Sequence, residues 1–282
     1  MLTRPIVEAA VRTALAEDAP WGDITVELAI PEKLGTAGRI VAREAGVFAG
    51  GALLRETFRQ ADERVAVDDL VDDGAPFEAG DVLARVAGPA RGVLTGERVA
   101  LNFAQRLSGV ATLTARYVSA VAHTSARIAD TRKTTPGLRA LEKAAVRAGG
   151  GCNHRFSLSD AIMIKDNHLA ALGAFDAATT TAALRRLRDR AGHTTSIIVE
   201  IDRLDQLDAV LAAAPTGVLL DNFTRSELEA AVQRIGGAVI AEASGGVTLD
   251  TVASIAETGV DVISVGRLTH GALALDLGLD AD

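Results

Sequence analysis

Three of the four lysines in this 282-residue chain lie in one short segment that is rich in anion-binding groups. Between residues 130 and 168, four Arg and three Lys oppose four acidic residues, a net charge of +3, so the rest of the chain carries −11. The spacing of Arg139, Lys143 and Arg147 is typical of a solvated helical face. The other basic residues share no helical face and therefore indicate a pocket for a small anion. They are Arg132, Lys133, His154, Arg155 and Lys165.

Carboxylates and glycine-containing turns follow predicted strands further along the chain. Glu200 and Asp221 lie near the ends of neighbouring strands, and such oxygens suit Mg²⁺, which binds through one or two carboxylates plus water and substrate phosphates. Sugar hydroxyls or a nearby cation are the open alternatives. The last two strands lead into Ser244-Gly245-Gly246 and into Gly266 with His270, and glycine N–H groups next to a helix start favour phosphate. These features predict a phosphorylated sugar, a metal and a carboxylate-rich second anion.

Short apolar segments alternate with helix-like segments after residue 125. Strands are expected at 127–130, 161–164, 196–201, 217–220, 238–241 and 262–265. Helices are expected at 136–148, 174–189, 204–213, 225–235 and 249–257. The alternation predicts a helix-covered parallel sheet, either a barrel or an open doubly wound sheet. Polar residues follow all six strands, and only a barrel brings all strand ends to one face, so the barrel is favoured.

The first part of the chain has a different pattern. Apolar residues at helical spacing predict a helix over 5–17, and short segments separated by glycine turns predict a β-rich unit over 35–93. A long helix is expected over 95–122, with Ser108–Gly109 as a candidate bend.

Composition excludes several classes of protein. The net charge of −8 argues against a general nucleic-acid binder, and the single cysteine, Cys152, excludes an intramolecular disulfide framework. No apolar run reaches the roughly 18–20 residues that span a bilayer, and the N-terminus lacks a signal-peptide core. A cytoplasmic protein is expected.

Two other readings of the basic segment stay open at this point. Lys165 follows an apolar strand, which is where the Schiff-base lysine of a barrel aldolase would stand. An aldolase, however, gives no reason for so many cations and a separate carboxylate pair. A non-catalytic anion-binding barrel would use the same cations, but the pair Glu200/Asp221 would be superfluous there.

Ordered motifs along the whole chain resemble those of the quinolinate phosphoribosyltransferase family. In the middle of the chain they are Asp130-Thr131-Arg132-Lys133-Thr134-Thr135-Pro136-Gly137-Leu138-Arg139, Gly149-Gly150-Gly151-Cys152-Asn153-His154-Arg155 and Ile164-Lys165-Asp166-Asn167-His168. Later come Leu220-Asp221-Asn222-Phe223, Glu242-Ala243-Ser244-Gly245-Gly246 and Val265-Gly266-Arg267-Leu268-Thr269-His270. The opening Glu17-Asp18 and Gly22-Asp23-Ile24-Thr25 also match. Ala144 and Cys152 depart from the family pattern but are not charged ligands.

The resemblance implies a reaction and a set of site residues. Quinolinate and phosphoribosyl pyrophosphate, with Mg²⁺ as cofactor, would give nicotinate mononucleotide, pyrophosphate and CO₂ for NAD synthesis. Quinolinate would be bound by Arg132, His154, Arg155 and Lys165, with Arg98 supplied by the partner subunit. Lys133, Glu200 and Asp221 would act on pyrophosphate, ribose and metal, the metal being held through water. The 5′-phosphate would be bound by Ser244, Gly245, Gly246, Gly266 and His270.

The resemblance also implies the architecture. The family fold is an N-terminal α/β sandwich domain plus an incomplete parallel α/β barrel of about six strands. The expected domains are 1–108, to which the segment 271–282 is a candidate addition, and 109–270. Arg98 implies a homodimer with shared active sites, and a higher assembly of dimers stays open. Neither nucleic acid nor membrane is expected as a partner.

Overall fold

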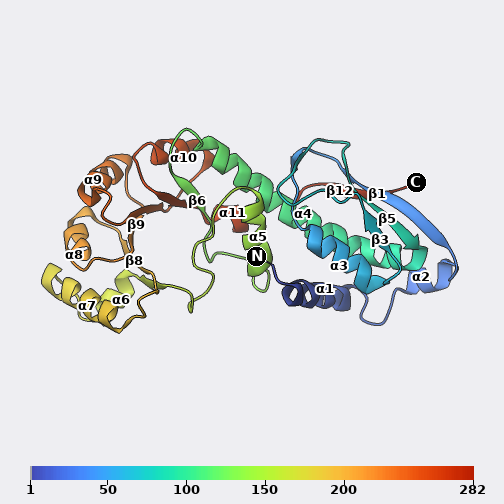
Figure 1. Cartoon of the computed structure of the whole chain (residues 1–282), viewed down its shortest axis with the longest axis horizontal. Helices are drawn as coiled ribbons and strands as arrows, with labels where there is room; N and C mark the ends of the chain where they lie inside the picture. Colours follow the sequence, from blue (N-terminus) through green and yellow to red (C-terminus); the bar gives the residue numbers. More distant parts are fainter. Residues whose placement is uncertain (1) are drawn as a thin grey trace. The chain divides into compact units, whose positions relative to one another are not determined.

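The computed structural model describes residues 2–282, which form two compact units (Figure 1). Unit 1 contains the described residues up to Ala115, together with Thr134–Gly150 and Arg267–Asp282. Unit 2 contains Arg116–Lys133 and Gly151–Gly266. This division groups residues 134–150 with the N-terminal part, whereas the sequence pattern places them in the 109–270 domain. Within residues 2–282 no helix combines the length and apolarity needed to cross a membrane.

Unit 1 is built on a four-stranded antiparallel sheet. Its strand order is β12 (Leu277–Ala281), β1 (Gly35–Ala42), β5 (Val82–Pro89) and β3 (Ala66–Asp68). A separate two-stranded sheet joins β2 (Gly46–Val47) to β4 (Pro76–Phe77). The helices are α1 (Arg4–Asp18), α2 (Ile24–Ala29), α3 (Gly51–Ala61), α5 (Arg139–Ala148) and α11 (Arg267–His270). Because β12 pairs with β1, the C-terminal segment completes the sheet of the N-terminal unit.

The core of unit 1 lies between this sheet and its helices. Ile40, Leu83 and Val86 of the sheet pack with Leu54, Phe58 and Leu101 of the helices, all at most 2% exposed. The long helix α4 (Ala90–Ala120) runs through Ser108–Gly109 without interruption. Gly109 is needed for a close approach, since a Cβ there would lie 1.8 Å from the Leu273 carbonyl oxygen.

A buried ion pair fastens two loop segments of unit 1. The Glu142 carboxylate is fully buried and accepts hydrogen bonds from Arg106 Nη2 at 2.7 Å and from Thr135 N–H at 3.0 Å. Arg106 also donates to the carbonyl oxygens of Thr269 and Ala272. Glu142 therefore restrains the residues that follow Lys133, and Arg106 restrains the turn that contains His270.

Unit 2 confirms the incomplete barrel. Six parallel strands lie in the order β6 (Arg127–Ala129), β11 (Val262–Ser264), β10 (Ile240–Ser244), β9 (Gly217–Asp221), β8 (Ile197–Ile201) and β7 (Ile162–Ile164). The helices are α6 (Asp166–Ala171), α7 (Ala177–Arg190), α8 (Leu207–Leu211), α9 (Arg225–Ile235) and α10 (Leu249–Ala256). In Figure 1, α7 to α10 follow one another around the outside of the strands. The sheet stays open because β6 and β7 form its two edges.

Several predicted boundaries are wrong for identifiable reasons. The helix expected from residue 136 begins at Arg139, because Gly137 adopts a left-handed φ of 81°. The helix expected over 174–189 is preceded by a separate α6, and α7 begins only after Asp176, whose side chain caps it. The strand expected at 238–241 is β10 at Ile240–Ser244, because Gly236 and Gly237 form a turn with positive φ before it.

Candidate active site

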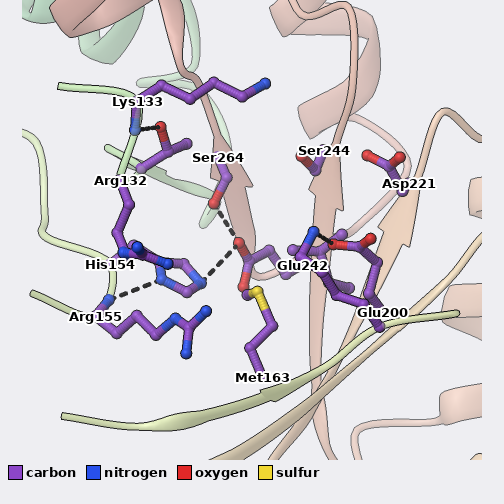
Figure 2. Close-up of a pocket in the computed structure, with 13 residues that line it drawn as sticks. Arg132, Lys133, His154, Arg155, Met163, Glu200, Asp221, Glu242, Ser244 and Ser264 are labelled. Carbon is purple, nitrogen blue, oxygen red and sulfur yellow. Dashed lines mark hydrogen bonds and ion pairs between the residues drawn. The ribbon is translucent and has the colours of Figure 1, made fainter. Parts of the chain in front are cut away.

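A cavity of about 370 Å³ opens in unit 2 where the parallel strands end. Residues of β7 to β11, of the loops that follow β6 and β7, and of the loop between α5 (Arg139–Ala148) and β7 supply its walls. The lining residues are Thr131, Arg132, Lys133, His154, Arg155, Met163, Lys165, Glu200, Leu219, Asp221, Glu242, Ser244 and Ser264. In Figure 2, Arg132, His154 and Arg155 lie on one side of the pocket, and Glu200, Asp221 and Ser244 on the other.

The basic side of the pocket contains two neighbouring guanidinium groups. Burial and the charge of Arg132 lower the pKa of Arg155, and the nearby Asp160 carboxylate offsets only part of this effect. Arg155 Nη1 donates to the Ala161 carbonyl oxygen at 3.0 Å, whereas the buried Nε of Arg132 has no hydrogen-bond partner. An unsatisfied buried donor beside a second positive charge favours an anionic ligand. Such a ligand would accept the missing hydrogen bond and would reduce the repulsion between the two guanidinium groups.

The buried Asp130 carboxylate positions the loop that carries His154. It accepts the His154 N–H at 2.8 Å and the Asn153 side-chain amide at 2.6 Å. Cys152 forms an isolated parallel bridge with Ala129, so this loop continues the sheet at the β6 edge. Burial raises the pKa of the Cys152 thiol, which fits a structural residue rather than a nucleophile.

The acidic side of the pocket contains two carboxylates at the ends of adjacent strands. Lys165 Nζ contacts Glu200 Oε2 at 2.7 Å, and Asn222 Nδ2 donates to Asp221 Oδ2 at 2.8 Å. Among residues 2–282 no group of three or more His, Cys, Asp or Glu side chains is arranged to hold a metal. Two carboxylates fit Mg²⁺ only in the mode in which water and substrate phosphates supply the remaining oxygens.

A third carboxylate, Glu242, lies between the two sides. Only 4% of Glu242 is exposed, and its Oε1 accepts a hydrogen bond from the Ser264 hydroxyl. His154 Nε2 lies 3.4 Å from the same oxygen (Figure 2). In the sequence, Glu242 directly follows the strand expected at 238–241 and begins a family motif, but it was given no site role.

The turn after β10 needs glycine at its first position. Gly245 has φ of 95°, and a Cβ there would lie 2.2 Å from Asn222 Oδ1. Asn222 is itself left-handed, with φ of 57°, and its N–H donates to the Ser244 carbonyl oxygen at 2.9 Å. The loops after β9 and β10 therefore lie against each other, which leaves Ser244 on the pocket wall.

Comparison with known proteins accounts for this arrangement. A model described as "Quinolinate phosphoribosyl transferase, C-terminal domain" matches residues 110–280, and the corresponding N-terminal model matches residues 23–108. The chain belongs to the quinolinate phosphoribosyl transferase family. As a member of this family it is an enzyme, a phosphoribosyltransferase, and the resemblance seen in its motifs is confirmed.

Individual members of the family are similar over nearly their full length. The nicotinate-nucleotide pyrophosphorylase [carboxylating] of Mycobacterium leprae is 46% identical over 278 residues, covering 96% of this chain and 95% of that protein. The quinolinate phosphoribosyltransferase [decarboxylating] 1b of Nicotiana tabacum is 38% identical over 290 residues, which cover 98% of this chain and 82% of that protein. The solved structure of the nicotinate-nucleotide pyrophosphorylase from Francisella tularensis superposes with a TM-score of 0.93 at 36% sequence identity. The match covers 100% of this chain and 98% of that chain.

The pocket of this phosphoribosyl transferase brings together eight of the residues singled out in the sequence. They are Arg132, Lys133, His154, Arg155, Lys165, Glu200, Asp221 and Ser244. Gly245, Gly246 and Gly266 are not among its lining residues, and Arg98 and His270 belong to unit 1. The ligand roles of all these residues stay predictions.

The pocket also contains residues that the sequence reasoning missed. These are Thr131, Met163, Leu219, Glu242 and Ser264. Three of them stand two positions before a predicted site residue, namely Met163 before Lys165, Leu219 before Asp221 and Glu242 before Ser244. Side chains two apart on a strand point to the same face, so strand periodicity could have found them.

Proposed function

We propose that this enzyme transfers the phosphoribosyl group of phosphoribosyl pyrophosphate to quinolinate. Magnesium-dependent transfer and loss of CO₂ would give nicotinate mononucleotide and pyrophosphate in de novo NAD biosynthesis. The observation that carries the proposal is the polarised pocket, in which two neighbouring guanidinium groups, one with an unsatisfied Nε, lie opposite a carboxylate pair (Figure 2). A dicarboxylate fits the first side, and a ribose with metal-bound pyrophosphate fits the second.

The roles of the individual residues follow from this polarity and from the family. Arg132, Arg155 and Lys165 would bind the two carboxylates of quinolinate next to His154, and Lys133 would contact pyrophosphate. Glu200 and Asp221 would hold the ribose hydroxyls and, through water, Mg²⁺. The 5′-phosphate subsite would use Ser244, Gly245 and Gly246, to which the family resemblance adds Gly266 and His270.

Positioning and charge stabilisation supply most of the catalysis in this mechanism. The cationic side chains orient the pyridine ring so that its nitrogen faces C1 of the ribose. The nitrogen lone pair forms the new N–C1 bond while the C1–O bond breaks, and pyrophosphate leaves with the bonding electrons. Bound Mg²⁺ would supply charge neutralisation on pyrophosphate. The ring nitrogen is then cationic, so when CO₂ leaves, the electron pair stays at C2, which takes up a proton.

An aldolase mechanism finds no support in the surroundings of Lys165. A Schiff-base lysine is activated by an apolar pocket or by adjacent cations. The Lys165 amine instead contacts the Glu200 carboxylate, and 45% of its side chain is exposed. These surroundings fit a lysine that binds an anion.

The test is an assay with Mg²⁺, phosphoribosyl pyrophosphate and quinolinate labelled in the 2-carboxyl group. Labelled CO₂ and nicotinate mononucleotide should appear together in equal amounts. If folded protein releases neither product, the proposal fails, and borohydride trapping of Lys165 with carbonyl substrates then tests the aldolase alternative.

We also infer a cytoplasmic homodimer in which Arg98 of the partner subunit completes each site. The support is the position of Arg98 outside the lining of the pocket in its own chain. Mixing an Arg98→Ala subunit with a Lys165→Ala subunit should restore part of the activity, because one site of the heterodimer then has both residues. A heterodimer proven by mass that shows no recovery contradicts shared sites.

A further inference from the structure

The mechanism above leaves one buried ionisable group of the pocket unused. Glu242 lies on β10, which is flanked by β9 and β11, and Ser264 on β11 donates to its Oε1. A buried carboxylate is costly unless it is paired and hydrogen-bonded. Its position in the pocket wall therefore calls for a reason beyond packing.

The hydrogen bonds around His154 determine where its ring proton lies. The Arg155 N–H donates to His154 Nδ1 at 2.7 Å, so Nδ1 is an acceptor and carries no proton. The proton of the neutral ring must then lie on Nε2, the nitrogen that faces Glu242 Oε1 at 3.4 Å. The two nitrogens are thus held from opposite sides, as the dashed lines in Figure 2 show.

We propose that Glu242, oriented by Ser264, is a positioning residue that accepts the Nε2 proton of His154 and so fixes the direction of the ring. His154 would then meet quinolinate with a fixed ring direction, beside the basic side chains of Arg132, Lys133, Arg155 and Lys165. This inference rests on the proposed function only for its effect on quinolinate. The state of the ring itself is independent of any substrate.

Nuclear magnetic resonance of the ligand-free enzyme labelled with ¹⁵N-histidine tests the state of the ring. The chain has five histidines, so the His154 signals can be assigned by substitution. We expect the ring proton to lie on Nε2 and to exchange slowly with water in the wild type and in Glu242→Gln, which keeps an acceptor. In Glu242→Leu this proton should exchange fast. Protons on both nitrogens of the wild-type ring, or an equally protected proton in folded Glu242→Leu, would overturn the proposal.

Steady-state kinetics tests the consequence for the substrate. In Glu242→Leu we expect the KM for quinolinate to rise about tenfold, as for a lost hydrogen bond near a charged ligand, with kcat and the KM for phosphoribosyl pyrophosphate within about threefold. In Glu242→Gln, kcat, the KM for quinolinate and the KM for phosphoribosyl pyrophosphate should all stay within about threefold of the wild type. A purely structural defect would lower kcat and raise both KM values together, which would contradict a positioning role.

A matched control exists in the same unit. His123 Nε2 and Glu257 Oε1 also lie 3.4 Å apart, but both side chains are about half exposed and neither lines the pocket. Glu257→Leu should therefore leave the kinetics unchanged. If Glu242→Leu does not fold, Ser264→Ala decides by the same two measurements, with a rise of about threefold expected in the KM for quinolinate. A wild type that has the expected ring state but no quinolinate turnover refutes the proposed function and leaves the positioning of His154 intact.

Discussion

Replacement of Arg155 by alanine removes one of the two neighbouring guanidinium groups on the basic side of the pocket. The side chain is held by its bond to Ala161, so its remaining N–H groups are pre-oriented for a substrate carboxylate. Two hydrogen bonds to a charged group contribute about 3 kcal/mol or more. Removal of Arg155 also relieves the repulsion from Arg132 that lowers its pKa, which offsets part of this loss. A net loss of about 2–3 kcal/mol corresponds to a decrease of roughly 30- to 150-fold in kcat/KM for quinolinate.

Isothermal titration with quinolinate measures its affinity, and initial rates at varied quinolinate concentration measure kcat/KM. In Arg155→Ala both quantities should decrease by the same factor relative to the wild type. The matched control is Arg147→Ala, since Arg147 belongs to the same basic segment but is exposed on α5 and does not line the pocket. The control should behave as the wild type. The reasoning is refuted if folded Arg155→Ala keeps quinolinate affinity and kcat/KM within twofold of the wild type, or if both variants lose activity equally.

Three further predictions concern stability, the metal and the cysteine. Arg106→Ala leaves the fully buried Glu142 carboxylate without its ion-pair partner and should lower the free energy of unfolding in urea by about 3–5 kcal/mol. Arg4→Ala, which removes an exposed ion pair, should leave the free energy of unfolding unchanged. Glu200→Gln should raise the Mg²⁺ concentration for half-maximal velocity about tenfold; an unchanged Mg²⁺ curve contradicts its role. Because burial raises the pKa of Cys152, maleimide labelling at pH 8 should be much slower in the folded protein than in urea, and equal rates would contradict this.

The strand ends of unit 2 could be predicted because short-range signals mark them. Each strand is a short apolar run that stops at polar residues, as at Asp221 at the end of β9 and Lys165 after β7. Parallel strands must present these ends on the same edge of the sheet, so the sequence pattern predicts one shared pocket. Two of the boundaries that failed lie beside Gly137 and beside Gly236–Gly237, where left-handed backbone redirects the chain without any change in hydrophobicity.

Glu242 shows where sequence reasoning stopped. Glu242 is one acidic residue at an apolar strand, and its neighbours in the sequence do not reveal which side chain it contacts. Its partner Ser264 is 22 positions away and His154 is 88 positions away, so only the pairing of β10 with β11 and of β11 with β6 brings the three residues together.

By itself, the sequence determined the class of fold and most of the charged residues of the pocket, because these depend on residue type and local periodicity, and its ordered motifs resemble those of the family. Tertiary structure alone decided which charges remain unsatisfied. Arg132 Nε is left without a hydrogen-bond partner, while Lys165 is paired with Glu200 and the ring of His154 is held between Arg155 and Glu242. The physical reason is that pairing depends on distances of a few ångströms between residues far apart in the chain, which strand register and burial set.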